Sequence, residues 1–137
     1  MAAARSTADE CVVRAACSDA SSRSDTGSAR LEPVPVIVSF YATPAYDTYG
    51  LLPQEFPRVH ADPNVLSKHR HRDDALCLYY PETDLTCRWT PDQGLLALLN
   101  LTRDHLFFEL HWRATGGHRG GTWLGPEAPH GLQRSAA

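Results

Sequence analysis

Cys77 is the side chain that its neighbours in the sequence make the strongest candidate for a reactive group. It stands in the run Leu-Cys-Leu-Tyr-Tyr-Pro at 76–81, and Trp-Thr-Pro follows at 89–91. A thiolate is a nucleophile whose reactivity depends on exposure and on nearby positive charge or a base. The basic loop at 68–72 could lower the pKa of the thiol, and Asp73 and Asp74 would oppose that effect. On spacing alone, a packed core cysteine and a nucleophile both stay open.

Histidines near this cysteine allow two other kinds of site. His69 and His71, with Cys77 and His60, offer nitrogen and sulfur donors to a metal, and a His-x-His pair on a strand points both rings to one face. A structural zinc site usually shows two paired ligand spacings, and a second pair is missing here. A protease-type Cys/His pair needs an oriented base, which any histidine and any aspartate would satisfy. The remaining histidines, His105 among them, are expected on the helix surface or in loops.

Bulk composition sets limits on function. The 137 residues suit one domain, and 13 basic against 16 acidic side chains give a net charge of −3. That balance provides no basic field for nucleic acid. No apolar run has the length of a membrane span or of a signal peptide, so we expect no membrane association and a cytoplasmic location. In a reducing cytosol the four cysteines (Cys11, Cys17, Cys77 and Cys87) are expected as thiols.

The elements that must position Cys77 follow from local patterns. Residues 1–30 are rich in Ala and Ser and lack aromatic residues, so they predict a disordered tail, with the domain at 31–137. Alternating apolar residues predict a half-buried strand at 34–40, with Pro35 near its start or on an edge. A second short strand is predicted at 57–61. A polar loop at 62–74 then leads into an extended segment at 75–80.

The strongest secondary-structure signal is a helix that follows Trp89. Thr90 can cap it, Pro91 takes the first helical position, and Gln93 completes a capping box. Gly116-Gly117 predicts its end, and Trp123 is expected to strap the C-terminal loop to the domain. The apolar residues that follow helical spacing are Leu95, Leu98, Leu99, Leu106 and Leu110.

The order of these motifs resembles the ubiquitin-conjugating enzymes, in which a Leu-Cys-Leu segment precedes a Trp-[Ser/Thr]-Pro element and a helix. The chain more closely resembles the divergent conjugating-enzyme-like proteins of bacterial type II CBASS anti-phage operons. Those proteins look like H-x-x-x-D-x-x-L-C-L-Y-Y-P, then W-x-P, a helix that ends near a Glu and a Trp, and a final W-L-G-x-E-A-P-H-G. The matching positions, over about 34–131, are His69 and Asp73, Leu76 to Pro81, Trp89 and Pro91, Glu109 and Trp112, and Trp123 to Gly131.

The resemblance implies a pared-down α+β fold with a small antiparallel sheet and one main C-terminal helix. It also implies an enzyme whose Cys77 carries the C-terminal acyl group of a partner as a thioester, without cofactor or metal. The implied partners are a cGAS-like nucleotidyltransferase and an activating enzyme. Familiar members carry His-Pro-Asn about eight residues before the cysteine, but Asn64 lies thirteen before it and His69 lies eight before it. We therefore expect His69, rather than Asn64, to support the oxyanion or act as base. The alternative is a non-catalytic protein-binding module of the same fold, with Cys77 as packing.

Overall fold

Strand β3 (Val34–Tyr41) is the centre of the sheet, and its sequence explains why. Its alternating residues Val36 and Val38 are fully buried, as the period-two pattern predicts, and Pro35 stands near its start. The structure, a computed structural model, describes residues 3–7, 10–17, 33–82 and 85–126. In these residues β3 pairs antiparallel with β2 (Glu10–Cys17) on one side and with β4 (Arg58–Ala61) on the other.

The N-terminal segment differs from the prediction of a disordered tail. Strand β1 (Ala3–Thr7) pairs with β2, and β2 pairs with β3 from Glu10↔Tyr41 to Cys17↔Val34. The sheet therefore has four strands in the order β1-β2-β3-β4, and it crosses the predicted boundary at 30/31. The averaged composition of the tail concealed a short β-prone stretch around Val12 and Val13, which gains backbone hydrogen bonds from β3. Residues 18–30 lie outside the described residues.

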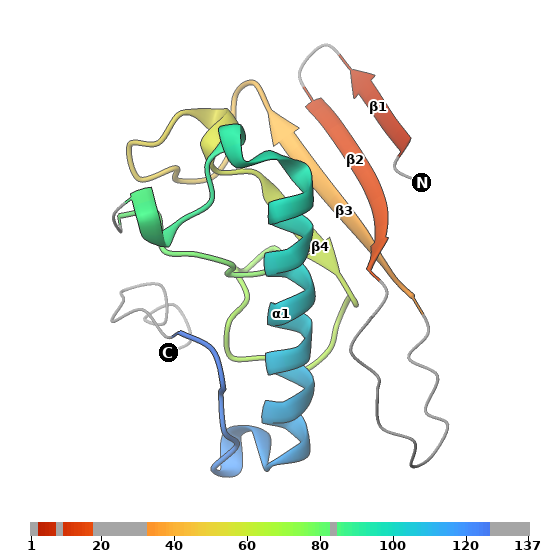
Figure 1. Ribbon diagram of the computed structural model, residues 1–137, viewed down its shortest axis with the longest axis vertical. Helices are drawn as coiled ribbons and strands as arrows, with labels where there is room; N and C mark the ends of the chain where they lie inside the picture. Colours follow the sequence, from red (N-terminus) through yellow and green to blue (C-terminus); the bar gives the residue numbers. More distant parts are fainter. Residues whose placement is uncertain (1–2, 8–9, 18–32, 83–84, 127–137) are drawn as a thin grey trace.

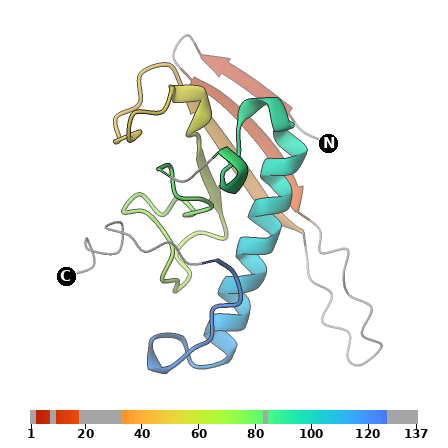
Figure 2. The same ribbon diagram turned by 60° about the vertical axis from the view of Figure 1, so that its left-hand side comes forward.

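One long helix, α1 (Gly94–Ala114), covers one face of this sheet (Figures 1 and 2). It follows a single 3-10 turn at Pro91–Gln93, and its C-cap is Thr115, directly before the predicted Gly-Gly stop. The predicted capping box is wrong, because neither Thr90 nor Gln93 makes a side-chain cap hydrogen bond. Instead, the indole Nε1 of Trp89 donates to the carbonyl of Gly94 at 2.8 Å, which fixes the start of the helix.

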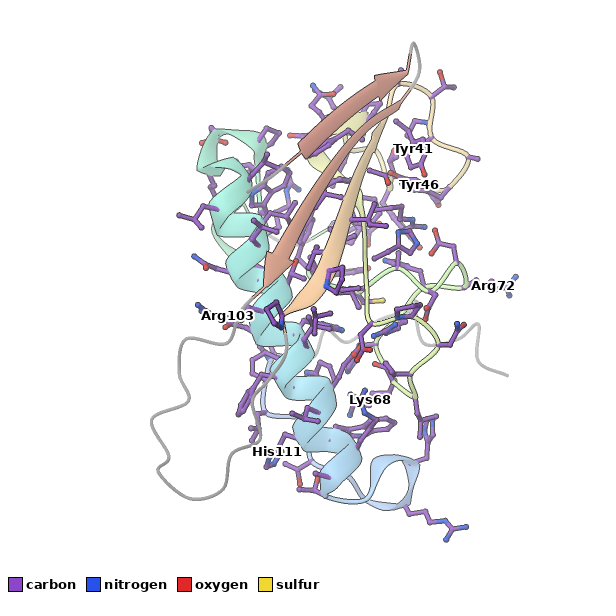
Figure 3. The ribbon with its side chains drawn as sticks, turned by 90° about the vertical axis from the view of Figure 1, so that its right-hand side faces the viewer. Tyr41, Tyr46, Lys68, Arg72, Arg103 and His111 are labelled. Carbon is purple, nitrogen blue, oxygen red and sulfur yellow. The ribbon has the colours of Figure 1, made fainter. Side chains whose placement is uncertain are left out.

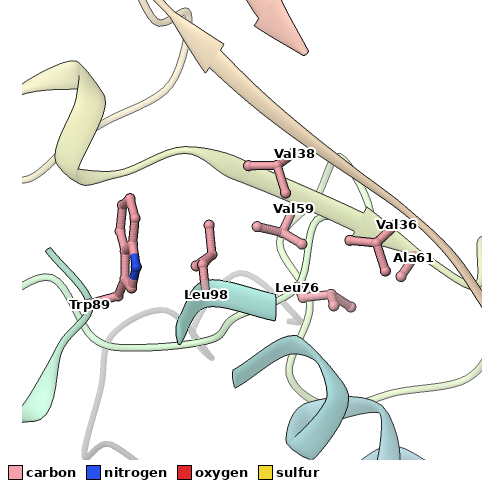
Figure 4. Packing of buried hydrophobic residues seen from close by; sticks show 7 residues of the cluster. All are labelled: Val36, Val38, Val59, Ala61, Leu76, Trp89 and Leu98. Atoms are coloured by element: carbon pink, nitrogen blue, oxygen red, sulfur yellow. The ribbon is translucent and has the colours of Figure 1, made fainter. Parts of the chain in front are cut away.

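The hydrophobic core lies between α1 and the sheet (Figure 4). Trp89 and Leu98 approach from the helix side, and Leu76 enters from the segment that carries Cys77. The buried strand residues of this cluster are Val36, Val38, Val59 and Ala61. The described residues thus form an α+β architecture of two layers. None of the helices in the described ranges is long and apolar enough to cross a lipid bilayer.

Candidate functional site around Cys77

Cys77 lies at the end of a tight hairpin at residues 69–77, which we call the Cys77 hairpin. The amide of His71 donates to the carbonyl of Ala75 at 2.8 Å, and the amide of Cys77 donates to the carbonyl of His69 at 3.0 Å. These bonds flank an antiparallel bridge between Arg70 and Leu76. His69 and Cys77 are therefore opposite one another, and opposite residues of an antiparallel pair project to the same face.

The hairpin is joined to the sheet directly beside Cys77. The amide of Leu76 donates to the carbonyl of Val59 in β4 at 2.8 Å, and Leu76 itself is buried. Cys77 thus lies one residue beyond this bond, and Arg58 lies one residue before it on β4. The predicted extended segment at 75–80 forms only this short pairing and no further strand among the described residues.

The basic loop does not activate the thiol in the resting protein. Burial raises the pKa of Cys77 to about 12, and the charge of Asp73 adds to this effect, whereas the charge of Arg58 opposes it. Cys77 nevertheless retains intermediate exposure. The expectation that residues 68–72 lower the thiol pKa is therefore wrong, because desolvation of a thiolate outweighs the nearby guanidinium. At neutral pH the thiol is protonated.

His69 is enclosed rather than presented to solvent. It is 5% exposed, and its ring meets that of Trp123 edge-on at a centroid distance of 4.4 Å. Trp123 also packs against His105 and Phe108 of α1, so it holds the C-terminal loop to the domain as predicted, and its contact with His69 joins that loop to the hairpin. Gly125 permits this path, because a Cβ there would come within 2.4 Å of the Phe108 ring. Residues 127–131 of the final motif lie outside the described residues.

Asn64 is placed away from this pair. It is exposed, has a φ of 64°, and its amide donates to the Asp74 carboxylate at 2.9 Å. Within the described ranges, no hydrogen bond or ion pair joins Asn64 to Cys77. The geometry thus brings together Cys77 and His69, and it uses Asn64 in the turn that enters the hairpin.

A buried ion pair fastens the Cys77 hairpin to α1. The guanidinium of Arg70 donates to both carboxylate oxygens of Glu109, from Nε and Nη2, at 2.8 Å each. The Glu109 side chain is fully buried and that of Arg70 is 5% exposed. Arg70 also reaches the Asp74 carboxylate at 3.1 Å, and His105 contacts Glu109 at 3.1 Å. Burial alone would raise the pKa of Glu109, but the hydrogen bonds from Arg70 and His105 lower it to about 2.

The Arg70–Glu109 ion pair, which we call the clamp, was not predicted from the sequence, and it changes which face of α1 is buried. His105 is 4% exposed rather than on the surface, while Leu95 and Leu110 are 38% and 47% exposed. A helix face that buries Glu109 needs a partner cation, and Arg70 supplies it from a loop thirty-nine residues away. The overlooked signal was the regular spacing of the residues that are now buried: Leu98, Thr102, His105, Glu109 and Trp112.

A pocket of about 610 Å³ opens on the sheet side of the hairpin. Its walls come from the 41–49 loop, from Arg58 of β4, and from His71, Arg72 and Asp73 at the hairpin tip. Figure 3 shows Tyr41 and Tyr46 side by side in this region, with Arg72 extending outward. After burial, the charges of Arg58 and Asp73 have the largest effects on the pKa of the Cys77 thiol, so the pocket and the thiol share their electrostatic surroundings.

The histidines proposed as metal ligands separate in the fold. His60 contacts the carbonyl of Asp73, His69 packs on Trp123, and His71 meets the ring of Phe56. Across the described ranges, no three His, Cys, Asp or Glu side chains lie close enough together to hold a metal ion. Comparison with known proteins finds no matching family model, no matching curated protein and no matching solved structure.

Proposed function

We propose that this protein is a conjugating-enzyme-like carrier in which Cys77 accepts the C-terminal acyl group of a partner protein as a thioester. The observation that carries the proposal is the pairing of Cys77 with His69 across a hairpin that α1 holds in place. The motif order that resembles CBASS conjugating-enzyme-like proteins supports the same reading, with a pared-down version of their fold. In that setting the acyl donor is a cGAS-like nucleotidyltransferase, loaded by an activating enzyme.

The chemical step is a transthiolation. The sulfur of Cys77 attacks the carbonyl carbon of a donor thioester, a new C–S bond forms, and the old C–S bond breaks. The donor leaves as a thiolate that takes up the proton lost by Cys77, so the step needs no oxidant or cofactor. Because the resting thiol is protonated, the reaction requires a group that removes its proton when the donor binds. His69, opposite Cys77, is our candidate for that role or for supporting the oxyanion.

The burial of Cys77 favours a second candidate function, a protein-binding module of the same fold without catalysis. A thiol whose pKa is raised to about 12 behaves as a small apolar side chain at neutral pH. On this alternative, the Cys77 hairpin and the C-terminal loop that Trp123 holds against it form a recognition surface, and Cys77 contributes only packing.

The two functions separate in a transfer assay. The candidate nucleotidyltransferase is prepared as a C-terminal glycyl thioester and mixed with this protein, and adducts are resolved on a non-reducing gel and by intact mass. The carrier predicts an adduct that thiol cleaves, a thiol-resistant oxyester or no adduct with Cys77→Ser, and slower transfer with His69→Ala. The exposed thiol of Cys87 provides the matched control, since Cys87→Ser should leave the adduct unchanged. An adduct that persists in Cys77→Ala contradicts the assignment.

Alkylation gives an independent reading of the same question. In the free protein, iodoacetamide at neutral pH should modify the exposed Cys87 before Cys77, because Cys77 is shielded and protonated. Binding of the partner with a free C-terminal carboxylate, which docks but cannot acylate the thiol, should accelerate alkylation of Cys77 if it is a carrier. A binding module predicts that the partner slows alkylation or leaves it unchanged, and that Cys77→Ala still binds the partner.

A further inference from the structure

The pocket beside the Cys77 hairpin contains an arginine with unused hydrogen-bond donors. Arg58 is 8% exposed, and its Nε lies 3.0 Å from the Asp73 carboxylate, which gives an ion pair but no well-directed hydrogen bond. In the described part of the chain, no acceptor is bonded to its two Nη atoms. Because Arg58 lines the pocket, these donors are available to whatever enters it.

The guanidinium of Arg58 is held in position before any ligand arrives. Its central carbon lies 3.8 Å from the centroid of the Tyr46 ring, and this stacking contact uses the face of the guanidinium rather than its N–H donors. Tyr46 is itself fixed, because its hydroxyl donates to the carbonyl of Phe56 at 2.6 Å. A pre-organised planar fork of this kind matches a carboxylate and loses little entropy on binding one.

The surroundings of Arg58 select the charge and shape of the ligand. The Asp73 side chain is 45% exposed and shares the pocket, so a doubly charged phosphate would meet more repulsion than a monoanion. His71 adds no charge near neutral pH, since burial and the charge of Arg58 lower its pKa to about 4. Tyr41 and Tyr49 supply flat walls, and a volume of about 610 Å³ accepts a small organic molecule or a few peptide residues.

We propose that this pocket binds a monocarboxylate joined to a flat aromatic or peptide group, with the carboxylate on the Nη edge of Arg58. The proposal does not depend on acyl transfer at Cys77. Two kinds of ligand have these features: a free aromatic acid and the C-terminus of a peptide. Both would place a carboxylate on Arg58.

Titrations followed by NMR of the ¹⁵N-labelled full chain test this site. The probes are 2-naphthoate for the aromatic source, N-acetylglycylglycine for the peptide source, and 2-naphthamide as the neutral control. At least one carboxylate should shift the amides of 41–49, Arg58 and 71–73, and the stronger binder identifies the source. Arg58→Gln should weaken binding about tenfold or more, as expected for loss of charge-assisted hydrogen bonds.

Two further variants keep the test decisive if Arg58→Gln fails to fold. Asp73→Asn removes the competing carboxylate and should tighten binding by roughly threefold, an effect that a purely structural residue would not produce. Arg72→Gln, at the exposed rim, should change the affinity by less than about threefold. The proposal is overturned if neither carboxylate shifts these amides, if 2-naphthamide binds as well as the stronger of the two carboxylates, or if Asp73→Asn weakens binding.

Discussion

Glu109→Gln is the substitution that most directly tests how α1 holds the Cys77 hairpin. It preserves the size of the side chain and removes its charge, which leaves Arg70 buried beside only the Asp74 carboxylate. Removing one partner of a buried pair typically costs about 3–5 kcal/mol, because the remaining charge stays desolvated. The glutamine oxygen still accepts one hydrogen bond and Asp74 remains, so we expect a loss of about 3 kcal/mol.

The pKa of Glu109 leads to the same magnitude. Its value falls from 4.5 to about 2, and at about 1.4 kcal/mol per pKa unit this difference corresponds to roughly 3 kcal/mol in favour of the charged carboxylate. Because the folded pKa is the lower one, this stabilisation is fully present above pH 4.5 and is lost as the pH falls toward 2.

Urea denaturation at pH 7, followed by circular dichroism, measures the effect. The matched control is Asp104→Asn on the same helix, where the pair with Arg103 is 43% and 50% exposed and should contribute less than about 1 kcal/mol. Replacing both partners, as Arg70→Met with Glu109→Leu, should recover much of the loss, since no charge is then left buried. If Glu109→Gln costs no more than Asp104→Asn, the clamp does not stabilise the hairpin and our reasoning is refuted.

Two further predictions concern other parts of the fold. His71 has a folded pKa of about 4 against 6.5 when unfolded, so the free energy of unfolding should be unaffected by its titration above pH 6.5 and should fall by up to about 3 kcal/mol between pH 6.5 and pH 4. His71→Phe should flatten this part of the stability profile in thermal melts. An unchanged slope would mean that other groups cause the pH dependence. Trp89→Ala should lower the free energy of unfolding by about 3–5 kcal/mol in urea titrations, because Trp89 is 2% exposed and its indole donates to the carbonyl of Gly94. Trp89→Phe keeps a large aromatic ring and should lower it clearly less. Equal losses in the two variants would contradict the packing argument.

The sequence by itself determined the local elements near Cys77. Alternation around Val36 and Val38 was sufficient to predict β3, and Pro91 with Gly116-Gly117 bounded the long helix. The strap at Trp123 was also predictable, because a single large aromatic in a glycine-rich segment has few other uses. These features depend on short-range periodicity and turn chemistry, which a sequence displays directly.

The tertiary structure alone decided which side chains meet and what chemistry they have. Burial set the Cys77 pKa against the nearby basic residues, and only the register of the hairpin placed His69 opposite the thiol. Arg70 and Glu109 are distant in the chain, so no local pattern linked them. Pairing with β3 likewise made a strand of a segment whose composition predicted disorder. Desolvation and long-range pairing depend on the whole packed chain, and that is why local sequence did not reveal them.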